Sequence, residues 1–292
     1  MYQTNMNAVP DVTAFFDDDT NTISYVVSDP VSNACAIIDP VMEFDYSAGR
    51  ITQHGADKII AFVREQGLTL EWLIETHVHA DHLSGAPYIQ DILGGKIGIG
   101  EHIITVQETF GKIFNEGTEF QRDGSQFDAL FQDGDTYTIG QIECFAMHTP
   151  GHTPACMVHV IGNSAFAGDT LFMPDGGSAR ADFPGGDAGE LYDSIMKVLS
   201  LPDEMRLFIC HDYGPGGRDI AWETTIGEEK KNNIHVGGGK SRDAFIKFRT
   251  ERDAQLAVPK LIIPSLQVNM RAGEVPTDAD GNMSLKIPVN KL

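Results

Sequence analysis

The spacing of apolar residues along the chain predicts short strands that alternate with amphipathic helices. Runs rich in Val and Ile, bounded by turn-forming residues, indicate strands at 22–29, 34–40 and 69–76. Apolar residues recur at helical spacing over 55–67, and that segment ends at a glycine. By the same criteria, further strands are expected at 96–100, 135–140, 142–149, 155–162, 164–169 and 206–212. Further helices are expected at 86–93, 102–114, 187–202 and 241–256.

Strands in runs, interleaved with helices, are typical of an α/β protein whose sheets are covered by helices on their outer faces. The 292 residues contain no internal repeat, low-complexity tract or convincing linker, so we predict a single domain over 1–292. Prolines punctuate the chain from Val258 onward, and we expect that part to be irregular. Residues 236–292 are therefore interpreted as a C-terminal elaboration of the domain.

The composition is acidic, with a formal net charge of −21. Nucleic acids and anionic membranes attract basic surfaces, so this charge argues against both as partners. A small anionic substrate remains compatible, but it would need a local cationic site. No apolar run reaches the roughly 18 residues of a membrane span, and the N-terminus has no signal-peptide pattern. The four cysteines are scattered without a CxxC pair, which indicates reduced thiols in a cytoplasmic protein.

The densest chemical motif is THVHADH at 76–82. His77 and His79 lie two residues apart just after a predicted strand, so an extended backbone would point both rings to the same side. Asp81 and His82 follow in the same loop and can serve an adjacent position. Imidazoles and a carboxylate at this density indicate a metal site.

Further candidate ligands lie where other predicted strands end. The loops at strand ends collect functional groups in α/β folds, so these residues are considered as metal ligands. His152 belongs to HTPGHT between two strands, Asp169 ends the strand at 164–169, and His211 ends the strand at 206–212. His148 precedes His152 by four residues, but the Pro-Gly turn can swing His152 out of the strand, which favours it as the ligand. Five histidines and two carboxylates would then converge on one or two metal ions.

Other catalytic motifs are weaker. No GxSxG motif is present, and Cys210 is interpreted as a strand thiol beside a metal ligand. The segment VGGGK at 236–240 does not meet the GxxxxGK[ST] pattern and indicates a flexible loop. The remaining histidines are interpreted as surface or hydrogen-bonded core residues: His54, His102, His159 and His235.

The order of THxHxDH, TPGHT, GDT and HDY along the chain resembles the metallo-β-lactamase superfamily over about 20–235. The resemblance implies an αββα sandwich, with two facing mixed β-sheets flanked by helices. Within the superfamily the chain is most similar to the glyoxalase II-like branch, and there to bacterial persulfide dioxygenases. The deciding segment is GGSARADFPGGDAGELYDSI at 176–195, which carries the Arg-x-Asp-Phe pattern of those dioxygenases. Where glyoxalase II enzymes have GCGR, this chain has GSAR, which removes a cysteine and keeps Arg180.

This resemblance implies one non-haem Fe(II) per chain, held by His77, His152 and Asp169, which would also be the catalytic residues. Such a two-histidine, one-carboxylate face leaves positions open for substrate and oxygen. The remaining ligand-type residues match a second zinc site of glyoxalase II relatives and would be vacant or supporting here: His79, Asp81, His82 and His211.

The reaction implied is the oxidation of glutathione persulfide by O2 and water to sulfite and glutathione, a step of sulfide detoxification in sulfur metabolism. Arg180 is the expected contact for a glutathione carboxylate, with Tyr213 and Arg218 as further contacts. An ion pair between Arg180 and Asp182 is the alternative interpretation. The resemblance also implies a homodimer.

Two other enzymatic functions compete. A hydroxyacylglutathione hydrolase would hold two zinc ions bridged by Asp169, and a metal-bound hydroxide would attack a thioester. All seven ligand-type residues are present, so only the Arg-Ala-Asp-Phe segment ranks this function second. A nucleic-acid-processing metallohydrolase is disfavoured by the acidic charge.

Overall fold

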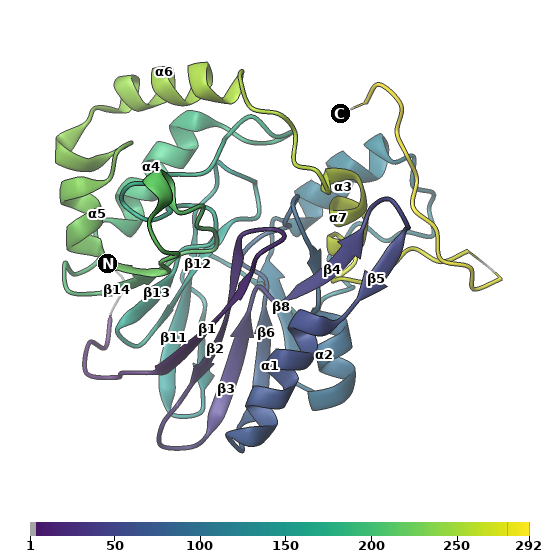
Figure 1. Cartoon of the computed structure of the whole chain (residues 1–292), viewed down its shortest axis with the longest axis horizontal. Helices are drawn as coiled ribbons and strands as arrows, with labels where there is room; N and C mark the ends of the chain where they lie inside the picture. The colour runs from purple at the N-terminus through teal and green to yellow at the C-terminus, as the bar shows by residue number, and fades with distance from the viewer. Residues whose placement is uncertain (1–3, 279, 292) are drawn as a thin grey trace.

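The computed structural model describes residues 4–278 and 280–291, and its centre is a pair of facing six-stranded sheets (Figure 1). The first sheet has the order β1-β2-β3-β6-β8-β9 and the second the order β10-β11-β12-β13-β14-β15. The strands of the first sheet are β1 (Asp11–Asp17), β2 (Thr22–Ser28), β3 (Ala34–Ile38), β6 (Thr69–Ile74), β8 (Lys96–Gly100) and β9 (Ala129–Phe131). Those of the second are β10 (Thr136–Ile139), β11 (Ile142–His148), β12 (Met157–Ile161), β13 (Ser164–Phe166), β14 (Arg206–Phe208) and β15 (Glu223–Thr225).

Both sheets are mixed. In the first, β1, β2 and β3 pair antiparallel, whereas β3, β6, β8 and β9 pair parallel. In the second, only β13 and β14 pair parallel. A small third sheet joins β5 (Arg50–Thr52), β4 (Val41–Asp45) and β7 (Leu83–Ser84) at the side of the sandwich.

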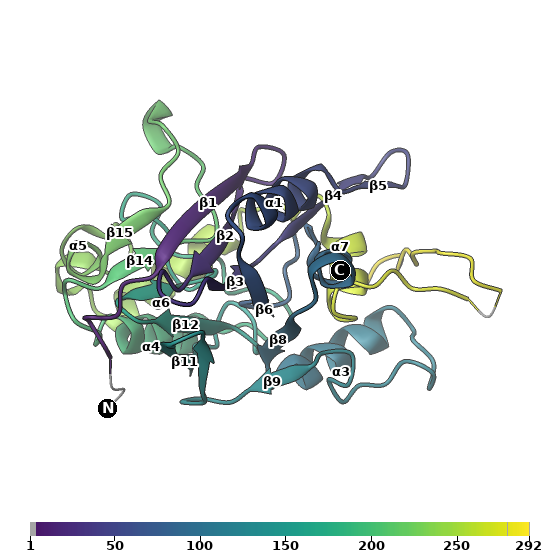
Figure 2. The ribbon, with the colours of Figure 1, turned by 90° about the horizontal axis from the view of Figure 1, so that it is seen from below.

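Helices cover the outer faces of both sheets (Figures 1 and 2). On the side of the first sheet lie α1 (His54–Glu65), α2 (Ala86–Leu93), α3 (Ile103–Ile113) and α7 (Ile262–Asn269). On the side of the second lie α4 (Ala188–Val198), α5 (Ile226–Asn232) and α6 (Arg242–Asp253). Two single turns of 3-10 helix, η1 (Pro215–Gly217) and η2 (Gly237–Gly239), complete the described chain. The predicted α/β sandwich of two mixed sheets flanked by helices is confirmed.

Three large apolar cores hold these layers together, beside two smaller clusters. Along β2, Tyr25 and Val27 point into the core between the sheets, whereas Val26 points to the core beneath α1 and α2. This alternation is the two-residue period of a strand, and both faces are buried because each sheet has a layer on either side. The third core packs the second sheet against α4 and α6, where the rings of Tyr192 and Phe245 lie 5.6 Å apart.

The expectation of an irregular chain after Val258 is wrong for Ile262–Asn269, because α7 forms there and is almost wholly buried, whereas the described residues after α7 contain no helix or strand. Pro264 misled the prediction: it lies in the first turn of α7, where the backbone N–H has no intrahelical partner to lose. The predictions also missed β1, β4, β5, β7, β9, β15 and α5. Several of these elements are short and lack a clear apolar pattern of their own. They form by pairing with a neighbouring strand, as the polar β15 pairs with β14. Within the described residues, no helix is long and apolar enough to span a membrane.

Candidate metal centre

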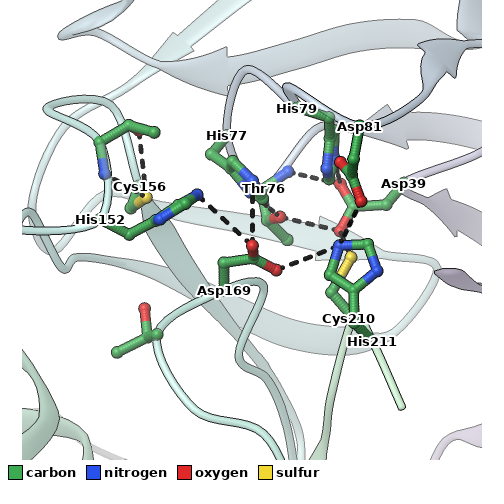
Figure 3. A network of polar contacts seen from close by, with 12 residues as sticks. Asp39, Thr76, His77, His79, Asp81, His152, Cys156, Asp169, Cys210 and His211 are labelled. Carbon is green, nitrogen blue, oxygen red and sulfur yellow. Dashed lines mark hydrogen bonds and ion pairs between the residues drawn. The ribbon is translucent and has the colours of Figure 1, made fainter. Parts of the chain in front are cut away.

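The predicted ligands gather in loops at one edge of the sandwich, where several strands end (Figure 3). The loop of His77 follows β6, and His152 lies between β11 and β12. Asp169 follows β13, and His211 follows β14. Because these strands are neighbours within their sheets and the sheets face one another, residues more than 130 positions apart along the chain meet at one point.

His77, His152 and Asp169 form the first group of ligand atoms. The Nε2 atoms of His77 and His152 lie 3.8 Å and 3.4 Å from Oδ2 of Asp169. All three ligand atoms lie within 4.8 Å of one another, and the side chains are buried. Two imidazole nitrogens and one carboxylate oxygen on one face are a donor set suited to a first-row transition metal.

The second group lies on the other side of Asp169. Nε2 of His211 is 3.2 Å from Oδ2 of Asp81 and 3.3 Å from Oδ1 of Asp169. His79, Asp81 and His82 also bring one ligand atom each within 4.8 Å of one another. The two oxygens of Asp169 therefore face two different sets of donors, as a bridging carboxylate would.

Protein oxygens behind the rings orient four of the histidines. Each ring turns its Nδ1 to such an oxygen, so that Nδ1 carries the proton and Nε2 keeps its lone pair for a metal. The partners are Thr76 Oγ1 for His77 (3.0 Å), Arg180 O for His152 (2.7 Å), Leu83 O for His82 (3.1 Å) and Asn21 O for His211 (3.3 Å). The ring pKa values of His77 and His82 are lowered by burial and by the neighbouring His79, to about 3 for His82, which favours the neutral ligand form.

His79 has the opposite orientation. Its Nε2 lies 2.9 Å from Oδ1 of Asp39 and 3.5 Å from Oε2 of Glu75, which leaves Nδ1 facing the site. Burial by itself would raise the pKa of the Asp39 carboxyl, but the charge and hydrogen bond of His79 and the hydrogen bonds of Thr76 lower it overall. Burial likewise opposes a charged His79, but the Asp39 charge together with the hydrogen bonds of Asp39, Cys210 and Glu75 raises the ring pKa overall.

Several ligand atoms have no hydrogen-bond partner although they are buried. These atoms are His79 Nδ1, His82 Nε2, His211 Nε2 and Asp169 Oδ1. The contact of 3.3 Å between His211 and Asp169 lacks the alignment of a hydrogen bond. A buried polar atom without a partner costs about 1–3 kcal/mol, and bound metal would give these atoms partners. The residues present therefore fit a metal ion.

Two supporting residues were missed by the sequence reasoning. Asp39 accepts hydrogen bonds from the backbone N–H of Thr76 (2.7 Å), from its hydroxyl (2.8 Å) and from His79. It follows β3, the strand beside β6, so the strand-end criterion used for Asp169 would have found it. Asn269 of α7 donates to the carbonyl oxygens of His79 and His82. No local signal in the sequence marks Asn269.

A cavity of about 1200 Å³ opens beside the site and is lined by His152, Asp169, Arg180 and Tyr213. The guanidinium of Arg180 forms two hydrogen bonds with Asp182, of 2.6 Å and 2.9 Å, and a third with the carbonyl oxygen of Ala257. The structure thus contains the ion pair of Arg180 with Asp182 that was the alternative interpretation of this residue, and the Arg180 side chain also lines the cavity.

Tyr213 and Arg218 differ in their placement. The ring of Tyr213 lies parallel to that of His211, 6.3 Å away, and the side chain is largely exposed to the cavity. Arg218 is held by Asp175 and Asp212 through four hydrogen bonds and is not among the residues that line the cavity. His148 packs against His102, and its Nε2 donates a hydrogen bond of 2.8 Å to the carbonyl oxygen of Pro154, outside the ligand group.

Comparison with known proteins identifies the family. Residues 18–211 match the family model described as the metallo-β-lactamase superfamily. The chain belongs to this superfamily. It is 51% identical to a probable metallo-hydrolase of Burkholderia pseudomallei, over 96% of this chain and 99% of the relative. It is 48% identical to glyoxylase B2 of Dictyostelium discoideum, over 91% and 92%.

Similarity within the superfamily extends to persulfide dioxygenases. The chain is 30% identical to the human mitochondrial persulfide dioxygenase ETHE1, over 88% of this chain and 86% of the relative. The crystal structure of ETHE1 from Myxococcus xanthus superposes with a TM-score of 0.72 at 29% identity, over 90% of this chain and 100% of that one. The predicted membership of this superfamily is thus confirmed, with persulfide dioxygenases and a glyoxylase among the relatives.

Proposed function

We propose that this protein is a persulfide dioxygenase that oxidises glutathione persulfide with O2 and water to sulfite and glutathione at one Fe(II) ion. The observation that carries the proposal is the grouping of His77, His152 and Asp169 at the wall of the cavity. The reaction balances: the terminal sulfur gives up four electrons, O2 accepts them, and water supplies the third oxygen of sulfite. The sulfur–sulfur bond breaks, and the glutathione thiol takes a proton.

The metal would supply the redox chemistry. When bound, Fe(II) would provide open coordination positions and could change its oxidation state. Zinc can offer an open position but cannot change its oxidation state. His77 and His152 would hold it with neutral Nε2 atoms, because Thr76 Oγ1 and Arg180 O keep the protons on Nδ1. Asp169 would supply the one anionic ligand. The similarity to ETHE1 proteins supports this assignment.

Aromatic side chains shape the approach to the site. Phe183 packs edge-on against His152 with ring centroids 5.4 Å apart, and the guanidinium of Arg180 lies over Phe183 at 4.8 Å. Phe172 makes a similar edge contact with His211. These rings would exclude water from the persulfide sulfur and hold His152 in place, which gives the Arg-Ala-Asp-Phe segment a physical role.

Cations in the cavity are the candidate contacts for the two carboxylates of glutathione. Arg50, Arg252 and Lys260 line it, and within residues 4–278 and 280–291 none of the three takes part in an ion pair. Arg180 lines it as well, with Asp182 already bound to its guanidinium. Carboxylate binding is therefore assigned to these unpaired cations, Arg50, Arg252 and Lys260. Arg180 and Tyr213 are kept as flanking contacts, and Arg218 has a structural role in holding Asp212.

A second function has its own supporting observation. The unpaired ligand atoms of His82, His211 and Asp169 favour a second metal ion, and the relative from Dictyostelium is named a glyoxylase. A hydroxyacylglutathione hydrolase would use two zinc ions bridged by Asp169 to split a thioester. This activity is the alternative to the dioxygenase.

One experiment separates the two functions. The protein is purified without oxygen, iron and zinc are counted per chain, and O2 uptake is followed with glutathione persulfide. One iron per chain and one O2 consumed per sulfite formed are the expected results. Two zinc ions per chain, with cleavage of a hydroxyacylglutathione and no O2 uptake, would overturn the proposal in favour of the hydrolase.

A further inference from the structure

We propose that the buried ion pair of Arg249 and Asp253 in α6 is a positioning device that holds the metal ligand His152 through a single peptide group. The proposal rests on the proposed function only in taking His152 as a ligand. It assigns a role to residues of the C-terminal segment, far from the ligand motifs in the sequence and outside the matched family region at 18–211.

The peptide group between Arg180 and Ala181 is the centre of the device. Its carbonyl oxygen accepts a hydrogen bond of 2.7 Å from Nδ1 of His152. Its N–H donates a hydrogen bond of 2.9 Å to Oδ2 of Asp253. The described chain contains no cis peptide bond, so the C=O and N–H of this planar group point in opposite directions. One rigid plane therefore connects the carboxylate to the imidazole.

The ion pair fixes the carboxylate end. Nε and Nη2 of Arg249 lie 2.8 Å and 2.6 Å from Oδ1 of Asp253, one helical turn away. Nη1 of the same guanidinium donates to the carbonyl oxygen of Ser178 at 3.0 Å. Arg249 and Asp253 thus hold both ends of the segment from Ser178 to Ala181, and both side chains are about 4% exposed.

The charge of Asp253 acts on His152 through the peptide group between them. A carboxylate that accepts from the N–H polarises the peptide group, and the carbonyl oxygen becomes a stronger acceptor for the imidazole proton. A stronger acceptor at Nδ1 makes Nε2 a better donor to a metal and restricts the rotation of the ring. A carboxylate bonded directly to a ligand histidine acts in the same way; here one peptide group lies between them.

The geometry also shows why an ion pair is present at this place. An unpaired Asp253 buried beside the loop would carry a large desolvation cost, which Arg249 offsets. Replacing both residues with apolar side chains of similar volume can leave a fold as stable as before. Removing both charges together avoids a lone buried charge but takes the partners from Ala181 N–H and Ser178 O, so the unfolding of the metal-free variant has to be measured beside its metal affinity to separate the positioning role from folding.

The test is the double variant Arg249→Met/Asp253→Leu, measured as full-length protein. The apo variant is first compared with the wild type by thermal unfolding. The dissociation constant of the first equivalent of Zn(II) is then measured by competition with a chromophoric chelator, and the absorption bands of the Co(II)-loaded protein are recorded. We expect the affinity to fall by about tenfold, the range seen when outer contacts of a ligand histidine are removed, with shifted Co(II) bands.

The exposed pair of Lys247 and Glu251 on the same helix provides the matched control. Lys247→Ala/Glu251→Ala is expected to keep the metal affinity within about twofold and the Co(II) bands unchanged. Wild-type affinity and bands in Arg249→Met/Asp253→Leu would overturn the proposal.

If that variant does not fold, Asp253→Asn decides the question. The asparagine keeps the acceptor oxygen but loses the charge, so affinity should fall by about threefold, because charged acceptors form hydrogen bonds about twice as strong. Unchanged affinity in Asp253→Asn would also reject the inference. Zn(II) affinity does not depend on the reaction catalysed, so a wild type that binds metal but oxidises no persulfide would reject the proposed function and leave this result standing.

Discussion

Asn269 donates a hydrogen bond of 2.8 Å to the backbone carbonyl oxygen of His82, 187 residues earlier in the chain. The same amide nitrogen lies 2.9 Å from the carbonyl oxygen of His79, and its carbonyl oxygen accepts from the N–H of Ser84. All of these groups are buried. A helix near the C-terminus therefore holds the backbone of the ligand loop in shape.

Replacing Asn269 with alanine should destabilise the protein by about 2–3 kcal/mol, because two buried carbonyl oxygens and one N–H lose their partner. Urea unfolding of the metal-free protein measures the change. Asn232→Ala, at an exposed position of α5, is the control and should stay within about 0.5 kcal/mol of the wild type. An Asn269→Ala protein as stable as the control would show that water satisfies the loop instead.

Ligand substitutions should distinguish one metal ion from two. Asp169→Ala is expected to lose the metal, because it removes the anionic donor shared by both groups. His82→Ala should retain most of it, since His82 lies outside the group of His77, His152 and Asp169. Elemental analysis after dialysis measures both. Equal loss in the two variants would instead favour the dinuclear hydrolase.

Removal of the cavity cations should affect substrate binding without affecting the chemical step. Arg252→Ala and Lys260→Ala are each expected to raise KM for glutathione persulfide about tenfold with little change in kcat, which corresponds to a lost contact with a charged group. Steady-state O2 uptake measures both constants. Lys58→Ala, on the exposed surface of α1, serves as the control. A fall in kcat at constant KM would contradict a binding role.

Stability should fall as the pH rises because of Glu229 in α5. Burial raises the pKa of this carboxyl to about 8, from an ordinary value of 4.5. Below pH 4.5, Glu229 is protonated in both the folded and the unfolded protein. Between pH 4.5 and about pH 8, the unfolded chain has lost a proton that the folded protein keeps. Folding is therefore penalised increasingly up to about pH 8, by an amount on the order of a few kcal/mol.

Glu229→Gln should remove this dependence. The variant should unfold at a higher urea concentration than the wild type at pH 8, with a smaller difference at pH 4.5. Glu228→Gln changes the exposed neighbour on the same helix and should keep the wild-type profile. Parallel pH profiles for the wild type and Glu229→Gln would mean that Glu229 ionises in the fold at its ordinary pKa.

Local information in the sequence was sufficient for most of the framework. The predicted segments agree with α1, α2, α3, α4 and α6 and with β2, β3, β6 and β8 to within a few residues. Periodicity and turn-forming residues act over about ten residues, so a single sequence displays them directly. The ligand-type residues were recognisable for the same reason: each lies in a short motif at the end of a strand.

The tertiary structure decided which of these groups meet and what supports them. Whether Arg180 faces a substrate or Asp182, and whether Arg218 reaches the cavity, depends on packing that no local pattern records. The same holds for Asn269 behind the ligand loop and for the ion pair of Arg249 and Asp253 behind His152. Motifs are local in the chain, whereas hydrogen bonds such as those from Ala181 to Asp253, 72 positions apart, and from Asn269 to His82, 187 positions apart, exist only once the sheets and helices have packed together.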